Sequence, residues 1–151
     1  MKPHATRIFA SLGLLGATSL LFFVRRYATK LLYEIEFFQA ADITSMRSRY
    51  AELLGDALKV PINPESYLDD IDGSFYVTGY LRSWAFEAQL RDFLRSELGN
   101  DWFAKRDAGD LLRELWSLGQ GPTADELLRD VTGAKLEMAS VAERIREGLG
   151  S

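Results

Sequence analysis

The chain has 151 residues, no cysteine, one histidine and a formal net charge of −4. Its hydrophobic fraction of 47% with 26% charged residues is typical of one folded domain with a real core. The absence of cysteine excludes disulfides, cysteine nucleophiles and thiolate metal sites. The single imidazole, His4, excludes an HExxH zinc site and argues against a serine–histidine–aspartate triad.

The charge is unevenly distributed along the chain. Residues 1–30 contain five basic residues and no acidic residue, and the remainder contains 13 basic and 22 acidic residues. Such an acidic body repels phosphates, and no predicted helix carries a basic stripe. We therefore expect no nucleic-acid partner.

The first predicted element is a hydrophobic N-terminal helix within residues 1–30. Ile8 to Val24 carry no charge, and basic residues flank them on both sides. At 17 residues the segment is at the lower edge of what spans a bilayer, and LLFFVRR offers no small residues for signal cleavage. A membrane anchor and a helix buried by other protein both remain open. We expect self-association, membrane entry or a partner through residues 8–24, and a location that is cytoplasmic, or membrane-associated if they act as an anchor.

The helical pattern continues to about Gln39. Glu34 and Glu36 could form a carboxylate pair for acid–base chemistry, but residues two apart point in different directions on a helix. We therefore expect them to face solvent or to form salt bridges. The next helix is predicted from Ile43 to Leu58, with Asp42 as its N-cap.

An acidic turn then leads into a long aromatic helix, predicted from about Ser74 to Leu98 and central to the fold. Calcium binding by Asp69, Asp70 and Asp72 is one interpretation, but the EF-hand spacing is missing, so an exposed turn with a helix N-cap is favoured.

Further helices are predicted around Leu111 to Leu118, after the capping box of Thr123 and Glu126, and from Leu136 to Leu149. Trp102 and Phe103 should tuck a short turn onto the core. The chain as a whole is predicted to be all-α, an irregular bundle of about six or seven helices with no significant sheet.

The stretch FYVTGYLRSWAFEAQL resembles the C-terminal helix of the oligopeptidase family of zinc metallopeptidases, which includes thimet oligopeptidase and oligoendopeptidase F. Gly73, Tyr80 and Trp84 are in register with that family's pattern, whereas Asp70 stands about where its loop histidine would be. FVRRYATKLLYE is similar to a helix downstream of the family's zinc motif, and weaker similarity extends from about Arg25 to about Leu149. Residues 31–151 thus resemble the C-terminal lobe of the catalytic domain.

The resemblance implies roles for four residues. Tyr80, and secondly Tyr76, would donate a hydrogen bond to the substrate carbonyl oxygen in the transition state, and Arg82 and Gly73 would contact substrate. The alternatives are that both tyrosines pack with their hydroxyls at the rim and that Arg82 forms an ordinary surface salt bridge.

Two functions remain open. The first is a fragment or remnant of a zinc metallopeptidase that carries the substrate-side helices, holds no cofactor itself, is inactive alone and meets peptides only when a missing segment completes it. The second is a small all-α interaction protein, anchored to a membrane in one version by residues 8–24.

Overall fold

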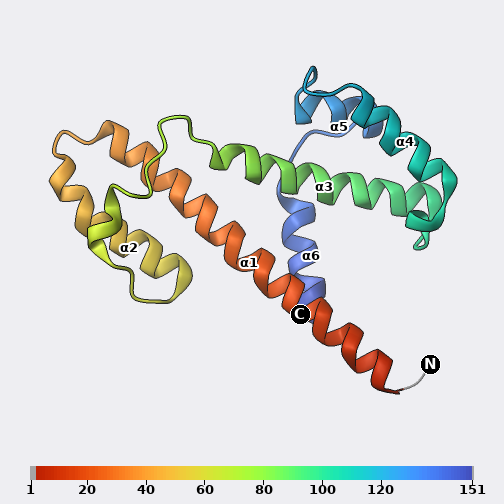
Figure 1. The fold of residues 1–151 in the computed structure, drawn as a ribbon, viewed down its shortest axis with the longest axis horizontal. Coiled ribbons are helices and arrows are strands. Elements are labelled where there is room, and N and C mark those ends of the chain that lie inside the picture. The colour runs from red at the N-terminus through yellow and green to blue at the C-terminus, as the bar shows by residue number, and fades with distance from the viewer. Residues whose placement is uncertain (1–2, 151) are drawn as a thin grey trace. The chain divides into compact units, whose positions relative to one another are not determined.

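The computed structural model describes residues 3–150, and the side chains from Gly13 onward. Within this range the elements are six α-helices and three short 3₁₀ helices, with no strand (Figure 1). The all-α prediction is therefore confirmed. The α-helices are α1 (Pro3–Gln39), α2 (Met46–Leu58), α3 (Val77–Leu98), α4 (Arg106–Ser117), α5 (Ala124–Thr132) and α6 (Ala139–Leu149), and the 3₁₀ helices are η1 (Ile43–Ser45), η2 (Pro64–Tyr67) and η3 (Trp102–Ala104).

The elements belong to two compact units. The first unit comprises Met1–Leu81 and Ile145–Ser151, and the second comprises Arg82–Arg144. Helices α3 and α6 each contribute residues to both units.

Helix α1 ends at Gln39, as its periodicity predicts, and runs through residue 30 without interruption. The side chains of residues 8–12 of the uncharged segment lie outside the described part. Among the helices of the described residues, none is long and apolar enough to cross a membrane.

The core of the first unit forms where α2 packs on α1. Met46, Tyr50 and Leu54 are spaced four residues apart, so they lie on one face of α2, and all three are buried. Tyr50 packs edge-on against Tyr33 of α1, with ring centroids 5.0 Å apart. Burying each such side chain contributes about 1.5–3 kcal/mol, which fixes α2 against α1. The helix stops at Lys59, whose φ of 59° is left-handed.

The C-terminal end of α6 packs closely on α1 within the same unit. A Cβ placed at Gly148 would overlap the Cβ of Ala17, which is itself buried. Glycine at this position therefore allows the two helices to approach.

The core of the second unit joins α3 to α4 and α5. Leu90 and Leu94 of α3 pack with Ala108 of α4, and further apolar side chains surround them: Phe86, Phe93, Leu98, Trp102, Leu111, Leu112, Leu115 and Val131. Trp102 packs here as expected, but Phe103 is 75% exposed, so the prediction that it tucks onto the core is wrong. The ring lies on the outer side of the short η3 turn.

Helix α3 begins at Val77, three residues later than the predicted Ser74. Phe75 has a φ of 52°, a left-handed conformation that cannot belong to a right-handed helix. The Asp72 carboxylate accepts hydrogen bonds from the backbone and the hydroxyl of Ser74, at 2.9 and 2.8 Å. This local turn competes successfully with helix extension.

The predicted capping box at the start of α5 is present. The Thr123 hydroxyl accepts the Glu126 amide, and the Glu126 carboxylate accepts the Thr123 amide at 2.7 Å. The Thr123 bonds hold the pKa of Glu126 below its usual range. Helix α5 ends where Gly133 takes a φ of 72°.

We predict that Thr123→Ala lowers the free energy of unfolding by about 1 kcal/mol, because two amides at the start of α5 lose or weaken their acceptors. Thr123→Ser keeps a hydroxyl at the same position and serves as the control. Chemical denaturation followed by circular dichroism measures both variants. Equal stability of the Ala and Ser variants would contradict the prediction.

Candidate functional site

The two tyrosines singled out by the resemblance lie together at the surface of the first unit. Tyr76 is 44% and Tyr80 48% exposed, and their ring centroids are 5.7 Å apart. Tyr27 of α1 packs edge-on against Tyr80 at 5.2 Å. The rings are therefore partly packed and partly open to solvent, an arrangement compatible with both roles considered for them. The transition-state role remains a prediction.

Gly73 lies exposed in the loop that precedes these tyrosines. A Cβ there would meet no atom within 4 Å, and its φ lies outside the left-handed region. Neither space nor backbone conformation requires glycine at this position, so its predicted substrate contact stays a prediction.

Arg82 belongs to the second unit and forms an ion pair with Asp125 of α5. Both side chains are partly exposed. This ion pair is the ordinary surface salt bridge that the sequence analysis gave as the alternative role of Arg82.

A buried ion pair holds the acidic loop against α1. Lys30 is 2% and Glu34 0% exposed, and Lys30 Nζ lies 2.6 Å from Glu34 Oε1. Lys30 also donates to the backbone carbonyl of Asp70, and Glu34 Oε1 accepts the backbone amide of Asp72 at 2.9 Å. One ion pair thus binds the loop backbone on both sides of Ile71.

The Asp70 carboxylate is drawn into the same network. Its Oδ2 atom lies 2.6 Å from Arg26 Nη2 and accepts the Tyr50 hydroxyl at 3.2 Å, and its Oδ1 atom lies 3.8 Å from Lys30 Nζ. We call Arg26, Lys30, Glu34 and Asp70, with the Asp72 amide, the loop clamp. Asp70, which the resemblance places about where the family has its loop histidine, is therefore a carboxylate that faces two cations.

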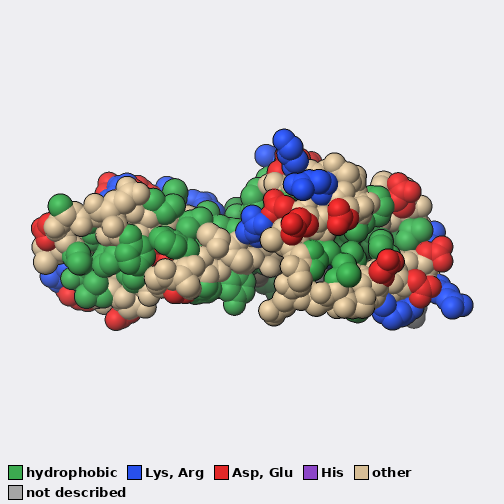
Figure 2. All heavy atoms as spheres, turned by 90° about the horizontal axis from the view of Figure 1, so that it is seen from above, with side chains coloured by type: hydrophobic (Ala, Val, Ile, Leu, Met, Phe, Trp, Pro, Cys, Tyr) green, Lys and Arg blue, Asp and Glu red, His purple; other side chains and the backbone are tan. Residues whose placement is uncertain are grey.

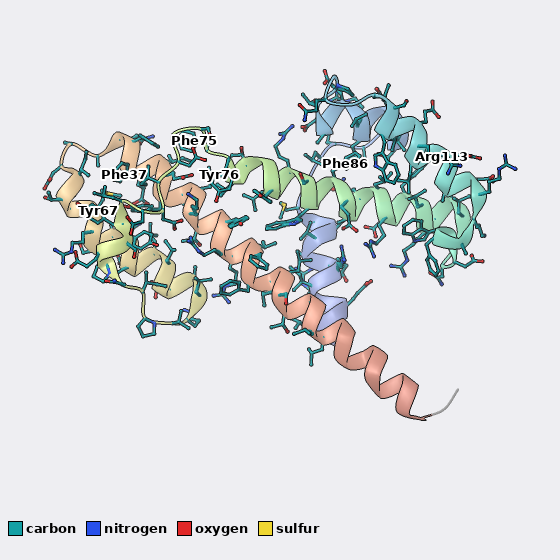
Figure 3. All side chains as sticks on the ribbon, viewed as in Figure 1. Phe37, Tyr67, Phe75, Tyr76, Phe86 and Arg113 are labelled. Atoms are coloured by element: carbon teal, nitrogen blue, oxygen red, sulfur yellow. The ribbon has the colours of Figure 1, made fainter. Side chains whose placement is uncertain are left out.

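The loop clamp reaches the tyrosine pair through Lys30. Its ammonium group lies 5.2 Å from the centroid of the Tyr76 ring, within the range of a cation–π interaction. Figure 3 labels Phe75 and Tyr76 in the segment that enters α3. Phe75 packs edge-on against Phe38 of α1, with centroids 5.4 Å apart.

The sequence analysis did not predict that Lys30 and Glu34 form a buried ion pair with each other. Their i, i+4 spacing was a visible signal, but it is also the spacing of ordinary surface pairs. Glu36 instead pairs with Arg49 of α2 at 2.7 Å, and the Arg49 bond lowers its pKa. Both glutamates are thus salt-bridged, as expected, and they do not form a carboxylate pair.

The acidic turn is capped at Ser74, but it is not the exposed helix N-cap that the sequence favoured, because Asp70 is partly buried and α3 begins only at Val77. Asp72 accepts the Ser74 amide, and this bond is the main cause of its lowered pKa. Across the described residues, no group of three or more histidine, aspartate or glutamate side chains is placed to hold a metal ion.

Two buried phenols form hydrogen bonds to the segment that joins α2 to α3. The Tyr33 hydroxyl donates to the Tyr67 carbonyl at 2.9 Å, and burial raises the pKa of Tyr33 to about 12. Burial likewise raises the pKa of Tyr50, with the Asp70 charge adding to the effect. Both groups stay neutral donors at physiological pH.

The chain matches no family model, no curated protein and no solved structure. The oligopeptidase resemblance therefore rests on the residues quoted for it.

We predict that Lys30→Met lowers the free energy of unfolding by about 3–5 kcal/mol, because it leaves the Glu34 charge buried without its cation. The double variant Lys30→Met with Glu34→Gln should be more stable than Lys30→Met alone. Urea denaturation of the wild type, both single variants and the double variant measures the coupling. Additive effects would show that the pair does not interact.

A second prediction concerns alkaline pH. A pKa raised from 10 to about 12 means that folding favours the neutral Tyr33 phenol. The associated stability, about 2–3 kcal/mol, is present below pH 10 and is lost as the pH rises to 12. Tyr33→Phe should therefore show a shallower fall in stability between pH 10 and 12. Parallel pH profiles for the wild type and the variant would contradict this assignment.

Proposed function

We propose that this chain carries the substrate-side helices of an oligopeptidase-like zinc metallopeptidase and acts on peptides only together with protein that supplies the zinc ligands. The main support is the exposed pair Tyr76 and Tyr80, held directly after the clamped loop. A phenol donates a directed hydrogen bond without adding charge, which suits a developing oxyanion. The resemblance of this helix to the family's tyrosine-bearing helix gives the pair its proposed role.

The proposal assigns separate tasks to this chain and to its complement. Tyr80, seconded by Tyr76, would donate to the substrate carbonyl oxygen, and Gly73 and Arg82 would contact the peptide. The metal ligands and the catalytic base would come from the complement, since His4 is the only imidazole here. A cytoplasmic location is part of the proposal.

We predict that the isolated chain binds no zinc at a stoichiometric site and hydrolyses no peptides. The reason is that one imidazole and no thiolate cannot form a tetrahedral protein site of the usual kind. Metal analysis after dialysis, together with an assay on short fluorogenic peptides, provides the measurement. One tightly bound zinc with chelator-sensitive turnover would falsify the division of tasks.

The proposal itself is tested by restoring the complement. If the coding sequence upstream of Met1 encodes an HExxH helix, expression of the joined product should give chelator-sensitive peptidase activity. Tyr80→Phe should then lower kcat by about 10²–10³, as loss of one oxyanion donor does, and Tyr76→Phe by less. Tyr67→Phe is the control, because its backbone carbonyl, not its hydroxyl, accepts the Tyr33 bond. Absence of such a motif, or full activity in Tyr80→Phe, would count against the proposal.

A second candidate function is that of a helical interaction protein, and the exposed apolar side chains of α1 favour it. Leu14, Leu15, Phe22 and Phe23 are 46–64% exposed. Figure 2 shows hydrophobic side chains, drawn in green, at the surface of the protein. Soluble monomers rarely expose large contiguous apolar patches, so this segment favours association. In this version the protein is cytoplasmic, or membrane-associated if residues 8–24 act as an anchor.

We predict that the full-length chain self-associates in detergent-free buffer and that Phe22→Ser with Phe23→Ser reduces the association. Each covered phenylalanine contributes about 1.5–3 kcal/mol, so losing two should weaken an assembly strongly. Light scattering measures the effect, and Phe103→Ser, at an exposed ring of the second unit, is the control. A monodisperse monomeric wild type would remove the support for this candidate.

A further inference from the structure

Two costly features meet at the loop that enters α3. Phe75, an aromatic residue, has a φ of 52°. Glu34 Oε2 and Arg26 Nη1 are buried and have no hydrogen-bond partner among the described residues. Strained backbone and unsatisfied buried atoms persist only where the surroundings hold them, and such outliers cluster at functional segments.

The loop is held at two backbone points by one ion pair. Lys30 donates a hydrogen bond to the Asp70 carbonyl, and Glu34 accepts one from the Asp72 amide, so the two bonds flank Ile71. Ile71 itself packs against the core of the first unit. The loop and the Tyr76 ring therefore share one support, the Lys30 ammonium, which lies 5.2 Å from the ring centroid.

We propose that Lys30 and Glu34 are positioning residues for Tyr76: their ion pair holds loop 69–76 closed on α1, and breaking the pair lets this segment open as a unit and moves the ring. Closure keeps Phe75 in its left-handed conformation, and opening relieves it. The position of Tyr76 has catalytic meaning only if the proposed function holds, whereas the clamp can be tested without it.

The test uses hydrogen exchange of the full chain, followed by NMR at individual amides. Glu34→Ala removes the partner of both Lys30 and the Asp72 amide. We expect exchange at Asp72 and its loop neighbours to rise about tenfold or more, and these amides to share one opening free energy below that of the amides at the centre of α1. Glu34→Gln keeps one acceptor oxygen and should give a smaller rise. Glu36→Ala, which breaks the Glu36–Arg49 pair on the same helix, is the matched control.

A second readout follows the ring of Tyr76, whose aromatic NMR signals are assigned with Tyr76→Phe. Lys30→Met removes the cation and should shift these signals, and Glu34→Ala should shift them too. Control signals from Tyr67 should stay in place.

The proposal is overturned if loop exchange in Glu34→Ala rises no more than in Glu36→Ala. It is also overturned if loop and α1 amides exchange with the same opening free energy, since the loop would then open only together with the whole unit. If Glu34→Ala does not fold, the same criteria apply to Glu34→Gln. If the joined product keeps its peptidase activity in Tyr76→Phe and Tyr80→Phe, the proposed function is wrong, but the result for the loop clamp still stands.

Discussion

The loop that enters α3 is held by a buried charge pair that does not stabilise simply by being charged. Taking the Lys30 ammonium and the Glu34 carboxylate out of water costs several kcal/mol each, and their attraction offsets this only if further hydrogen bonds satisfy them. The loop backbone supplies one such bond to each partner, through the Asp70 carbonyl and the Asp72 amide, and leaves only Glu34 Oε2 of the pair without one. The ion pair and the loop therefore require each other, because neither is satisfied alone.

This mutual requirement determines where α3 starts and where its first aromatic side chains lie. With the loop backbone fixed at Asp72, the Asp72 carboxylate forms its own turn with Ser74, and Phe75 turns out of the helical path. Helix α3 can begin only afterwards, at Val77. Tyr76 consequently sits just before the helix, over Lys30, and not one turn inside it.

Periodicity and capping chemistry predicted most of the fold. The C-terminal ends of α1 and α2 and the capping box at Thr123 were all readable, because local sequence determines them. The start of α2 was predicted at Ile43, but Asp42 caps the 3₁₀ helix η1 instead, and α2 begins at Met46. The loop clamp could not be predicted from local sequence in the same way. A lysine and a glutamate four apart look the same on a surface as in a core, and the loop groups that bond to this pair, the Asp70 carbonyl and the Asp72 amide, are distant in the sequence. The left-handed Phe75 was equally hidden, since no local rule places an aromatic residue there.

Under the proposed function, the nature of Asp70 limits the chemistry that the loop can contribute. An imidazole at this position could donate a hydrogen bond to a substrate, whereas an ionised carboxylate only accepts hydrogen bonds. Asp70 faces Arg26 and Lys30, so its charge serves to anchor the loop. Under the proposed function, donation to a carbonyl oxygen from this segment would then fall to the phenols of Tyr76 and Tyr80. Their placement would then matter more here than in the oligopeptidases that the helix resembles, which have a loop histidine, and the proposed role of the loop clamp is to set the placement of Tyr76.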